Sequence, residues 1–143
     1  MKIFFDMDGT IANLYGVENW LPKLIAEKTE PYAEAKPLVN MNSLARILNK
    51  LQKKGYEIGI ISWTAKNGTI EYNKAVAETK KEWLKKHLAS VKFNEIHIVE
   101  YGTPKAIFAN ENAILFDDEE QNRKTWTGKA FTAENIIEIL KRF

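Results

Sequence analysis

Apolar residues recur along this chain in two rhythms, one helical and one of short continuous runs. The first helical spacing is carried by four apolar residues, Leu44, Ile47, Leu48 and Leu51. Gly55 is suited to end that helix, and residues 56–61 are a largely apolar run of strand length. The pattern therefore predicts a helix followed by a buried strand.

The second half of the chain repeats this alternation. Residues 70–88 are predicted to form a long helix with its lysines outward and four residues toward the core, Val76, Trp83, Leu84 and Leu88. Residues 95–99 and 113–116 are strand candidates, and 129–131 is a short edge strand. Thr132 is expected to cap a last helix with an apolar face, formed by Ile136, Ile137, Leu140 and Phe143.

Strands that alternate with helices predict an α/β fold with a mostly parallel sheet covered on both faces. Ile3-Phe4-Phe5 supplies a further buried strand near the start. The 143 residues, of which 45% are hydrophobic, match one domain of ordinary size, able to bury a single core. We therefore expect a single domain over residues 1–143.

Composition narrows the class of protein. No cysteine is present, which excludes disulfides and thiol catalysis and fits a cytoplasmic protein. No apolar run reaches the roughly 18 residues of a membrane span, and a strand begins at once, so we expect neither a membrane segment nor a signal peptide. The net charge of +2 is too small to indicate a nucleic-acid partner.

The most informative motif is Asp6-Met7-Asp8-Gly9-Thr10, which follows the first strand. Side chains alternate along extended backbone, so Asp6 and Asp8 would share a face and repel each other unless a cation neutralises them. Mg²⁺ suits such a site because it prefers oxygen ligands and keeps waters that a phosphate can replace. Gly9 permits a tight bend and Thr10 offers a hydroxyl, so both are candidates for phosphate binding. The alternative is a surface turn in which Asp8 and Gly9 supply only turn chemistry.

A second acid pair, Asp117 and Asp118, follows another strand candidate. Ligands of an open parallel sheet bind beyond the carboxyl ends of its strands, so both acid pairs are expected to face one crevice. Ser62, Trp63 and Thr64 end a third strand and would bring hydroxyls and turn amides suited to phosphate oxygens. Ser62 is preferred over Thr64 as the phosphate hydroxyl because it directly follows the apolar run.

Lys105 is the preferred cation for the same edge, since it stands at the start of a short predicted helix. Lys80 and Lys81 are alternatives, but they belong to the charged helical segment 70–88, where a lysine is usually solvated. Acids for a metal, hydroxyls for phosphate and one lysine together indicate a site for a small phosphorylated substrate.

This ordered set resembles the four motifs of the haloacid dehalogenase (HAD) superfamily of phosphatases over residues 2–119. The resemblance implies a three-layer Rossmann-like domain in which Asp6 forms an aspartyl-phosphate and Asp8 acts as general acid and then base. It also implies that Ser62 and Lys105 hold the phosphoryl oxygens. The implied Mg²⁺ ligands are Asp6, the backbone carbonyl of Asp8, and Asp117, with Asp118 beside or behind it.

Within the superfamily, the short helical insert 11–42 and the segment 83–88 are most similar to the 5'(3')-deoxyribonucleotidases. This similarity implies a small cap over the site and a nucleotide as substrate. The flat base would stack on an aromatic residue such as Tyr15, Trp20 or Trp63, although core packing is the preferred role for Trp20.

Two other functions are considered. A polynucleotide 3'-phosphatase would take a nucleic-acid end as substrate, with the lysines of 66–86 as a track for the strand. Glutamates interleave with those lysines, which favours a solvated helix face. A catalytically silent phosphate-binding module is the second alternative. The sequence argues against it, because every position that a phosphatase needs carries a competent residue.

Overall fold

The computed structural model describes residues 1–143 and is built around a five-stranded sheet. The strand order is β5-β4-β1-β6-β7, and every neighbouring pair is parallel. The strands are β1 (Lys2–Phe5), β4 (Glu57–Trp63), β5 (Glu95–Val99), β6 (Ala113–Phe116) and β7 (Ala130–Phe131). The predicted parallel sheet is therefore confirmed.

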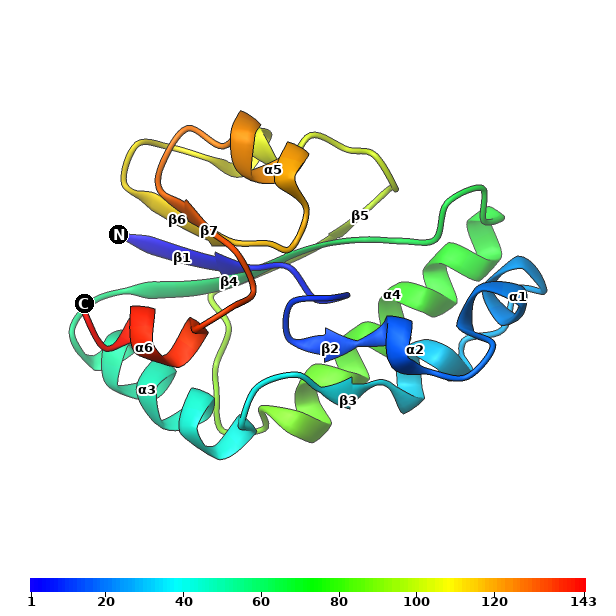
Figure 1. Cartoon of the computed structure of the whole chain (residues 1–143), viewed down its shortest axis with the longest axis horizontal. Helices are drawn as coiled ribbons and strands as arrows, with labels where there is room; N and C mark the ends of the chain where they lie inside the picture. Colours follow the sequence, from blue (N-terminus) through cyan, green and yellow to red (C-terminus); the bar gives the residue numbers. More distant parts are fainter.

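Helices cover both faces of this sheet. One face packs against three α-helices, α3 (Met41–Lys53), α4 (Ile70–His87) and α6 (Ile136–Leu140). The other face carries the 3₁₀ helix η2 (Lys105–Phe108) and the helix α5 (Glu120–Thr125). Figure 1 shows α5 on the opposite side of the sheet from α3 and α6. These layers confirm the predicted α/β fold class. No helix combines the length and the apolar character needed to cross a membrane.

Alternation of side chains along the strands divides the core in two. Ile3 and Phe5 of β1 point into the larger cluster, against α3, α4 and α6, whereas Phe4 joins a smaller cluster with Trp126. A strand buried on both faces is apolar at every position, without a polar alternation. This is why the short apolar runs were sufficient to identify β1 and β6.

The segment 11–42 lies beyond the carboxyl ends of β1 and β4, at the end of the molecule away from both termini (Figure 1). Pro22 and Pro31 fall in the first turns of two short helices, where a proline is tolerated. The elements of the segment are β2 (Ala12–Asn13), η1 (Leu14–Gly16), α1 (Trp20–Ile25), α2 (Glu30–Glu34) and β3 (Lys36–Pro37).

Hydrogen bonds fasten this segment to the start of α4. The Glu27 carboxylate accepts two hydrogen bonds from Thr69, one from its backbone N–H at 2.8 Å and one from its side-chain hydroxyl at 3.2 Å. Thr69 is also the N-cap of α4, so a negative charge here lies at the favourable end of the helix dipole. One turn further on, the Tyr72 hydroxyl donates to the carbonyl of Lys28 at 2.7 Å. The 11–42 segment is therefore held against α4 at two successive turns.

Two expectations about element ends are wrong. Thr132 does not cap α6, because its hydroxyl accepts the N–H of Glu134 in a local turn at 3.3 Å. The helix begins only after Asn135, which has a left-handed φ of 59° and makes no side-chain cap. β4 extends two residues past its predicted end, to Trp63, because these residues still pair with β5.

Candidate active site

The carboxyl ends of β1 and β6 meet at the centre of the sheet. The chain proceeds from β1 to β4 and β5 on one side and from β6 to β7 on the other, so the strand order reverses between β1 and β6. Ligands of open α/β sheets bind at such a reversal. Asp6 and Asp117 directly follow these two strands, and the N–H of Asp6 donates to the carbonyl of Phe116 at 2.9 Å. The sheet therefore places one acid of each pair side by side.

Asp6, Asp117 and Asp118 form an acid cluster, in which one carboxylate oxygen of each residue lies within 4.8 Å of the others. The Thr10 Oγ1 atom lies 3.1 Å from Asp6 Oδ2 and 3.2 Å from Asp118 Oδ1. Carboxylate oxygens converging from two strands are the donors that a hard divalent cation such as Mg²⁺ takes. The structure thus brings together acids from opposite ends of the chain in a set that fits a metal ion.

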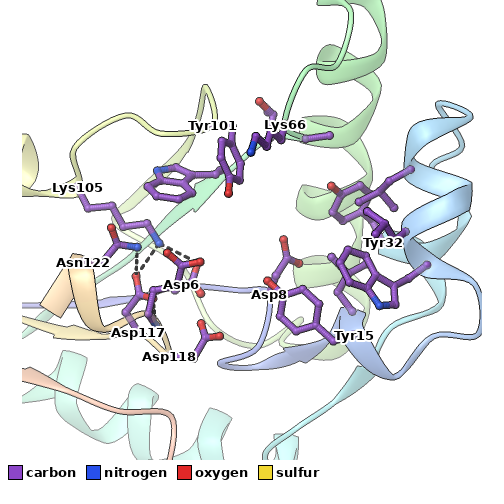
Figure 2. Close-up of a pocket in the computed structure, with 18 of the residues that line it drawn as sticks. Asp6, Asp8, Tyr15, Tyr32, Lys66, Tyr101, Lys105, Asp117, Asp118 and Asn122 are labelled. Carbon is purple, nitrogen blue, oxygen red and sulfur yellow. Dashed lines mark hydrogen bonds and ion pairs between the residues drawn. The ribbon is translucent and has the colours of Figure 1, made fainter.

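Lys105 bridges two members of the acid cluster (Figure 2). Its Nζ atom donates to Asp6 Oδ1 at 2.8 Å and to Asp117 Oδ2 at 2.7 Å. Burial disfavours the charged form, but the two carboxylates outweigh it and raise the pKa of Lys105 above its ordinary value. An ammonium group has three protons, so one N–H of Lys105 remains for a ligand.

Burial and crowding also perturb the acids themselves. Burial away from solvent is the main cause, and the negative charge of Asp6 is the second. Together they raise the pKa of Asp117 to about 6 and the pKa of Asp118 to about 7. Asn122 Nδ2 donates to Asp117 Oδ2 at 3.1 Å, and Arg123 Nη1 donates to the Asp117 carbonyl at 3.0 Å. Both acids therefore lose their protons at a higher pH than a free aspartate does.

The Asp8 carboxylate stands apart from the acid cluster and faces the side of the cavity where Tyr15 and Tyr32 lie (Figure 2). Its Oδ2 atom accepts a hydrogen bond from Lys80 Nζ at 2.8 Å. Burial raises the pKa of Asp8, and the charge of Lys80 opposes that rise. A carboxyl group with a raised pKa at a cavity wall is suited to donate and accept protons.

Lys80 overturns an expectation, since it is not solvated. Its side chain is 1% exposed, and Nζ donates to Asp8 Oδ2 at 2.8 Å, to Ser62 Oγ at 2.7 Å and to the carbonyl of Trp63 at 2.7 Å. All three ammonium protons are used within the protein. Lys80 therefore fixes Asp8 and the end of β4 and has no proton left for a ligand, unlike the preferred Lys105.

The helical pattern of α4 did contain a signal for Lys80. It shares the buried face with Val76, Trp83 and Leu84, at the i, i+4, i+7 and i+8 positions of one stripe. A charged residue on such a stripe requires a buried partner. Lys81, the next residue, is 45% exposed and follows the expected outward pattern.

Ser62 and Thr64 differ in their access to the site. Ser62 is fully buried and bonded to Lys80, whereas Thr64 is 8% exposed and lines the cavity. Trp63 lines the cavity too, with its ring 5.3 Å from Lys105 Nζ and its indole N–H donating to a backbone carbonyl at 2.9 Å. The identity of the phosphate hydroxyl remains a prediction, and Thr64 is the residue that faces the cavity.

Gly9 and Thr10 shape the turn after β1. The N–H of Gly9 donates to the Ala12 carbonyl at 2.9 Å, and the N–H of Thr10 donates to the Met7 carbonyl at 3.0 Å. A Cβ atom on Gly9 would lie 2.3 Å from Asp118 Oδ2, and its φ of +81° is left-handed. The hydrogen bonds of Gly9 and Thr10 stabilise the turn, and the absence of a side chain on Gly9 leaves space for the Asp118 carboxylate. The phosphate contacts of both residues remain predictions.

A cavity of about 240 Å³ opens over the acid cluster. On one side the rings of Trp63 and Tyr101 lie with centroids 4.9 Å apart, and on another Tyr15 and Trp20 meet edge to face at 4.9 Å. Figure 2 shows Tyr101 and Tyr15 on different sides of the opening. The cavity thus combines a charged floor with aromatic walls.

Comparison with known proteins supports the fold. No protein-family model matches the chain, and no curated protein sequence matches it. Among solved structures, a D,D-heptose 1,7-bisphosphate phosphatase from Burkholderia thailandensis is similar, with a TM-score of 0.54 and 13% identity over 99% of this chain and 97% of that one. This likeness extends the α/β architecture over the whole chain and concerns the fold alone.

Lys80→Met should destabilise the protein in a pH-dependent manner. The change leaves Asp8 buried without a cation and raises its pKa further. An acid whose pKa is raised on folding contributes to the stability of the protein at low pH, and this contribution is lost as pH rises through the folded-state pKa. In urea denaturation we expect a loss of about 3 kcal/mol at pH 8 and a much smaller loss at pH 5. Lys81→Met, the exposed neighbour, should lose under about 0.5 kcal/mol at both pH values. Equal losses of the Lys80 variant at both pH values would contradict this role.

Mg²⁺ should stabilise the protein more at pH 8 than at pH 5. The pKa values of Asp117 and Asp118 are raised on folding, so their contribution to stability is present below about pH 4 and falls as pH rises through 6 and 7. Mg²⁺ at ~100 times its Kd should restore about 2.7 kcal/mol at pH 8, a rise of roughly 9 °C in Tm. Asp118→Asn should weaken this difference. A Tm shift that is equal at both pH values speaks against a cation site in the cluster.

Gly9→Ala should remove the Mg²⁺ response, because its Cβ atom would collide with Asp118. Gly102→Ala is the matched control, since Gly102 also has a positive φ, +87°, but no atom lies within 4 Å of its Cβ position. Both variants carry a backbone strain of about 1 kcal/mol. Calorimetric titration with Mg²⁺ should show binding to the Gly102 variant and strongly weakened binding to the Gly9 variant. Equal affinities would show that Gly9 does not make room for the cluster.

Proposed function

We propose that this chain is a Mg²⁺-dependent phosphomonoester hydrolase of the HAD type. The observation that supports the proposal most strongly is the environment of Asp6, whose carboxylate lies between the Lys105 ammonium and two further acids on the floor of a cavity. Such a carboxylate is held in place for attack, and the charges around it suit a phosphate group. The fold shared with a solved phosphatase agrees with this function.

In the first step, an oxygen of Asp6 would attack phosphorus, and the bond from phosphorus to the ester oxygen would break. Asp8 would give its proton to the departing alkoxide, for which the raised pKa of Asp8 is favourable. In the second step, Asp8 would take a proton from water as the water oxygen attacks the phosphorus of the aspartyl-phosphate and the bond from phosphorus to the Asp6 oxygen breaks. Inorganic phosphate and free Asp6 result, so protons and electron pairs balance.

The two buried lysines would have different roles in the reaction. Lys105, with one free proton, would donate to a phosphoryl oxygen, and Thr64 lines the same cavity. Lys80 would orient Asp8 from beneath. The acid cluster would hold Mg²⁺ through Asp6 and Asp117, with Asp118 adjoining, and the bound ion would offset the repulsion between the nucleophile and the substrate anion.

We further propose that the 11–42 segment is a small cap and that the substrate is a nucleotide. The two aromatic pairs that line the cavity support a planar leaving group, because bases stack on aromatic rings. The solved phosphatase of similar fold is named for a heptose bisphosphate. Sugar phosphates therefore belong in any substrate panel.

A polynucleotide 3'-phosphatase is the alternative with a specific observation in its favour. Lys66 is exposed at the cavity rim, 5.9 Å from the Tyr101 ring, where a further phosphate of a strand could approach. A strand binder loses affinity steeply with added salt, whereas a mononucleotide phosphatase loses little. Salt dependence of KM for mononucleotide and oligonucleotide substrates therefore separates the two.

Asp6→Asn should abolish turnover across a panel of phosphomonoesters. The panel includes 5'- and 3'-deoxynucleotides, sugar phosphates and a 3'-phosphorylated oligonucleotide, each with and without Mg²⁺. Phosphate release should require Mg²⁺ and should fall by roughly a thousandfold or more in the variant, because an amide is not a competent nucleophile.

Glu119→Gln is the matched control, because Glu119 lines the cavity but lies outside the acid cluster. It should retain activity within about tenfold. Wild-type turnover by the Asp6 variant would exclude the covalent mechanism. Absence of Mg²⁺-stimulated release from every ester would favour the silent phosphate-binding module.

A further inference from the structure

The helix α1 exposes apolar side chains that a surface helix usually turns toward the protein core. Its sequence is Trp-Leu-Pro-Lys-Leu-Ile, yet none of its residues is buried, and Leu21 and Ile25 are 50% and 75% exposed. Single exposed aliphatic residues are common on protein surfaces and carry no meaning alone. Their position relative to the site therefore decides whether they matter.

Leu21 and Ile25 line the same cavity as Asp6 and Asp8. Other comparably exposed aliphatic residues, such as Leu38 (46%) and Ile70 (74%), do not line it. The exposed face of α1 is thus continuous with the catalytic floor. A substrate whose phosphate lies at Asp6 would extend its remaining part along this face.

The α1 side of the cavity differs in chemistry from the floor. The floor holds the acids and Lys105, whereas the wall on the α1 side consists of Leu14, Tyr15, Trp20, Leu21, Leu24 and Ile25. Tyr32 lies on the same side, so the polar atoms there are the hydroxyls of Tyr15 and Tyr32 and the Trp20 indole N–H. A polyhydroxylated group placed against such a wall would lose water without gaining enough hydrogen bonds, whereas an apolar or planar group would gain from burial.

The wall is preformed in this structure. Glu27, two residues after α1, has a left-handed φ of 57° and binds the N–H and hydroxyl of Thr69 at the start of α4. Holding a non-glycine residue in this conformation is unfavourable, and the two hydrogen bonds of Glu27 offset that cost. A wall fixed in this way needs no ordering when a substrate binds.

We propose that Leu21 and Ile25 determine specificity by contacting the leaving group, and that they select phosphomonoesters with a planar, apolar leaving group over those with a polyhydroxylated one. The proposal rests on the proposed function, because it assumes that the phosphate is cleaved at Asp6. It goes beyond that function by assigning the selection to an aliphatic face of α1.

The test compares benzyl phosphate with glycerol 3-phosphate, two esters of alcohols with similar leaving-group basicity. In the double variant Leu21→Ser/Ile25→Ser, kcat/KM for benzyl phosphate should fall by roughly tenfold to fiftyfold, mainly through KM. For glycerol 3-phosphate it should change by less than about threefold. The matched control is Leu38→Ser/Ile70→Ser, which removes one leucine and one isoleucine of similar exposure from outside the cavity and should leave both esters unaffected.

Three results would overturn the inference. One is an unchanged benzyl phosphate KM in the α1 variant, another is an equal loss for both esters, and the third is the same loss in the control variant. In each case a wild-type enzyme that still hydrolyses the esters leaves the proposed function intact. A wild-type protein that hydrolyses other esters of the phosphomonoester panel but not benzyl phosphate would overturn this inference and leave the proposed function intact, whereas the absence of release from every ester of the panel would refute both.

Discussion

Four carboxylates crowd the carboxyl ends of two adjacent strands, and their mutual repulsion is the constraint to which the rest of the site responds. Asp6 and Asp117 follow β1 and β6 directly, so the register of the sheet forces them together. Two buried lysines supply the compensating charge, Lys105 within the acid cluster and Lys80 beside Asp8. The pKa values of Asp117 and Asp118 remain raised despite this, so the site still favours a further cation.

The two lysines differ in how many of their ammonium protons donate hydrogen bonds within the protein, and so they have different roles. Lys80 donates all three to the protein and so fixes the geometry of Asp8 and the end of β4. Lys105 donates two, which leaves one for a ligand. The helix α4 connects this arrangement to the 11–42 segment, since the helix that carries Lys80 into the site also holds Glu27 at its first residues. The apolar wall at the cavity and the Asp8 carboxylate are therefore positioned by one element.

Sequence reasoning identified the sheet and the acids because both are encoded locally. Apolar runs that end in acids define β1 and β6, and strand topology then brings their ends together. Lys80 was misjudged because the charge of its helix was given more weight than its place on the buried stripe of α4, and the identity of its partner, Asp8, 72 residues away, is not encoded in that stripe. Thr132 was misjudged because a threonine before an apolar stretch fits a local turn as well as a helix cap. Contacts between distant residues are what local patterns lack.

The most direct measurement of the central claim is a crystal structure of the protein with Mg²⁺ and beryllium fluoride, a mimic of an acyl-phosphate group. The account predicts beryllium bonded to a carboxylate oxygen of Asp6. It also predicts Mg²⁺ bound between Asp6 and Asp117, and a fluorine atom accepting a hydrogen bond from Lys105. Beryllium fluoride bonded to Asp8, or Mg²⁺ bound away from the Asp6–Asp117 pair, would contradict it.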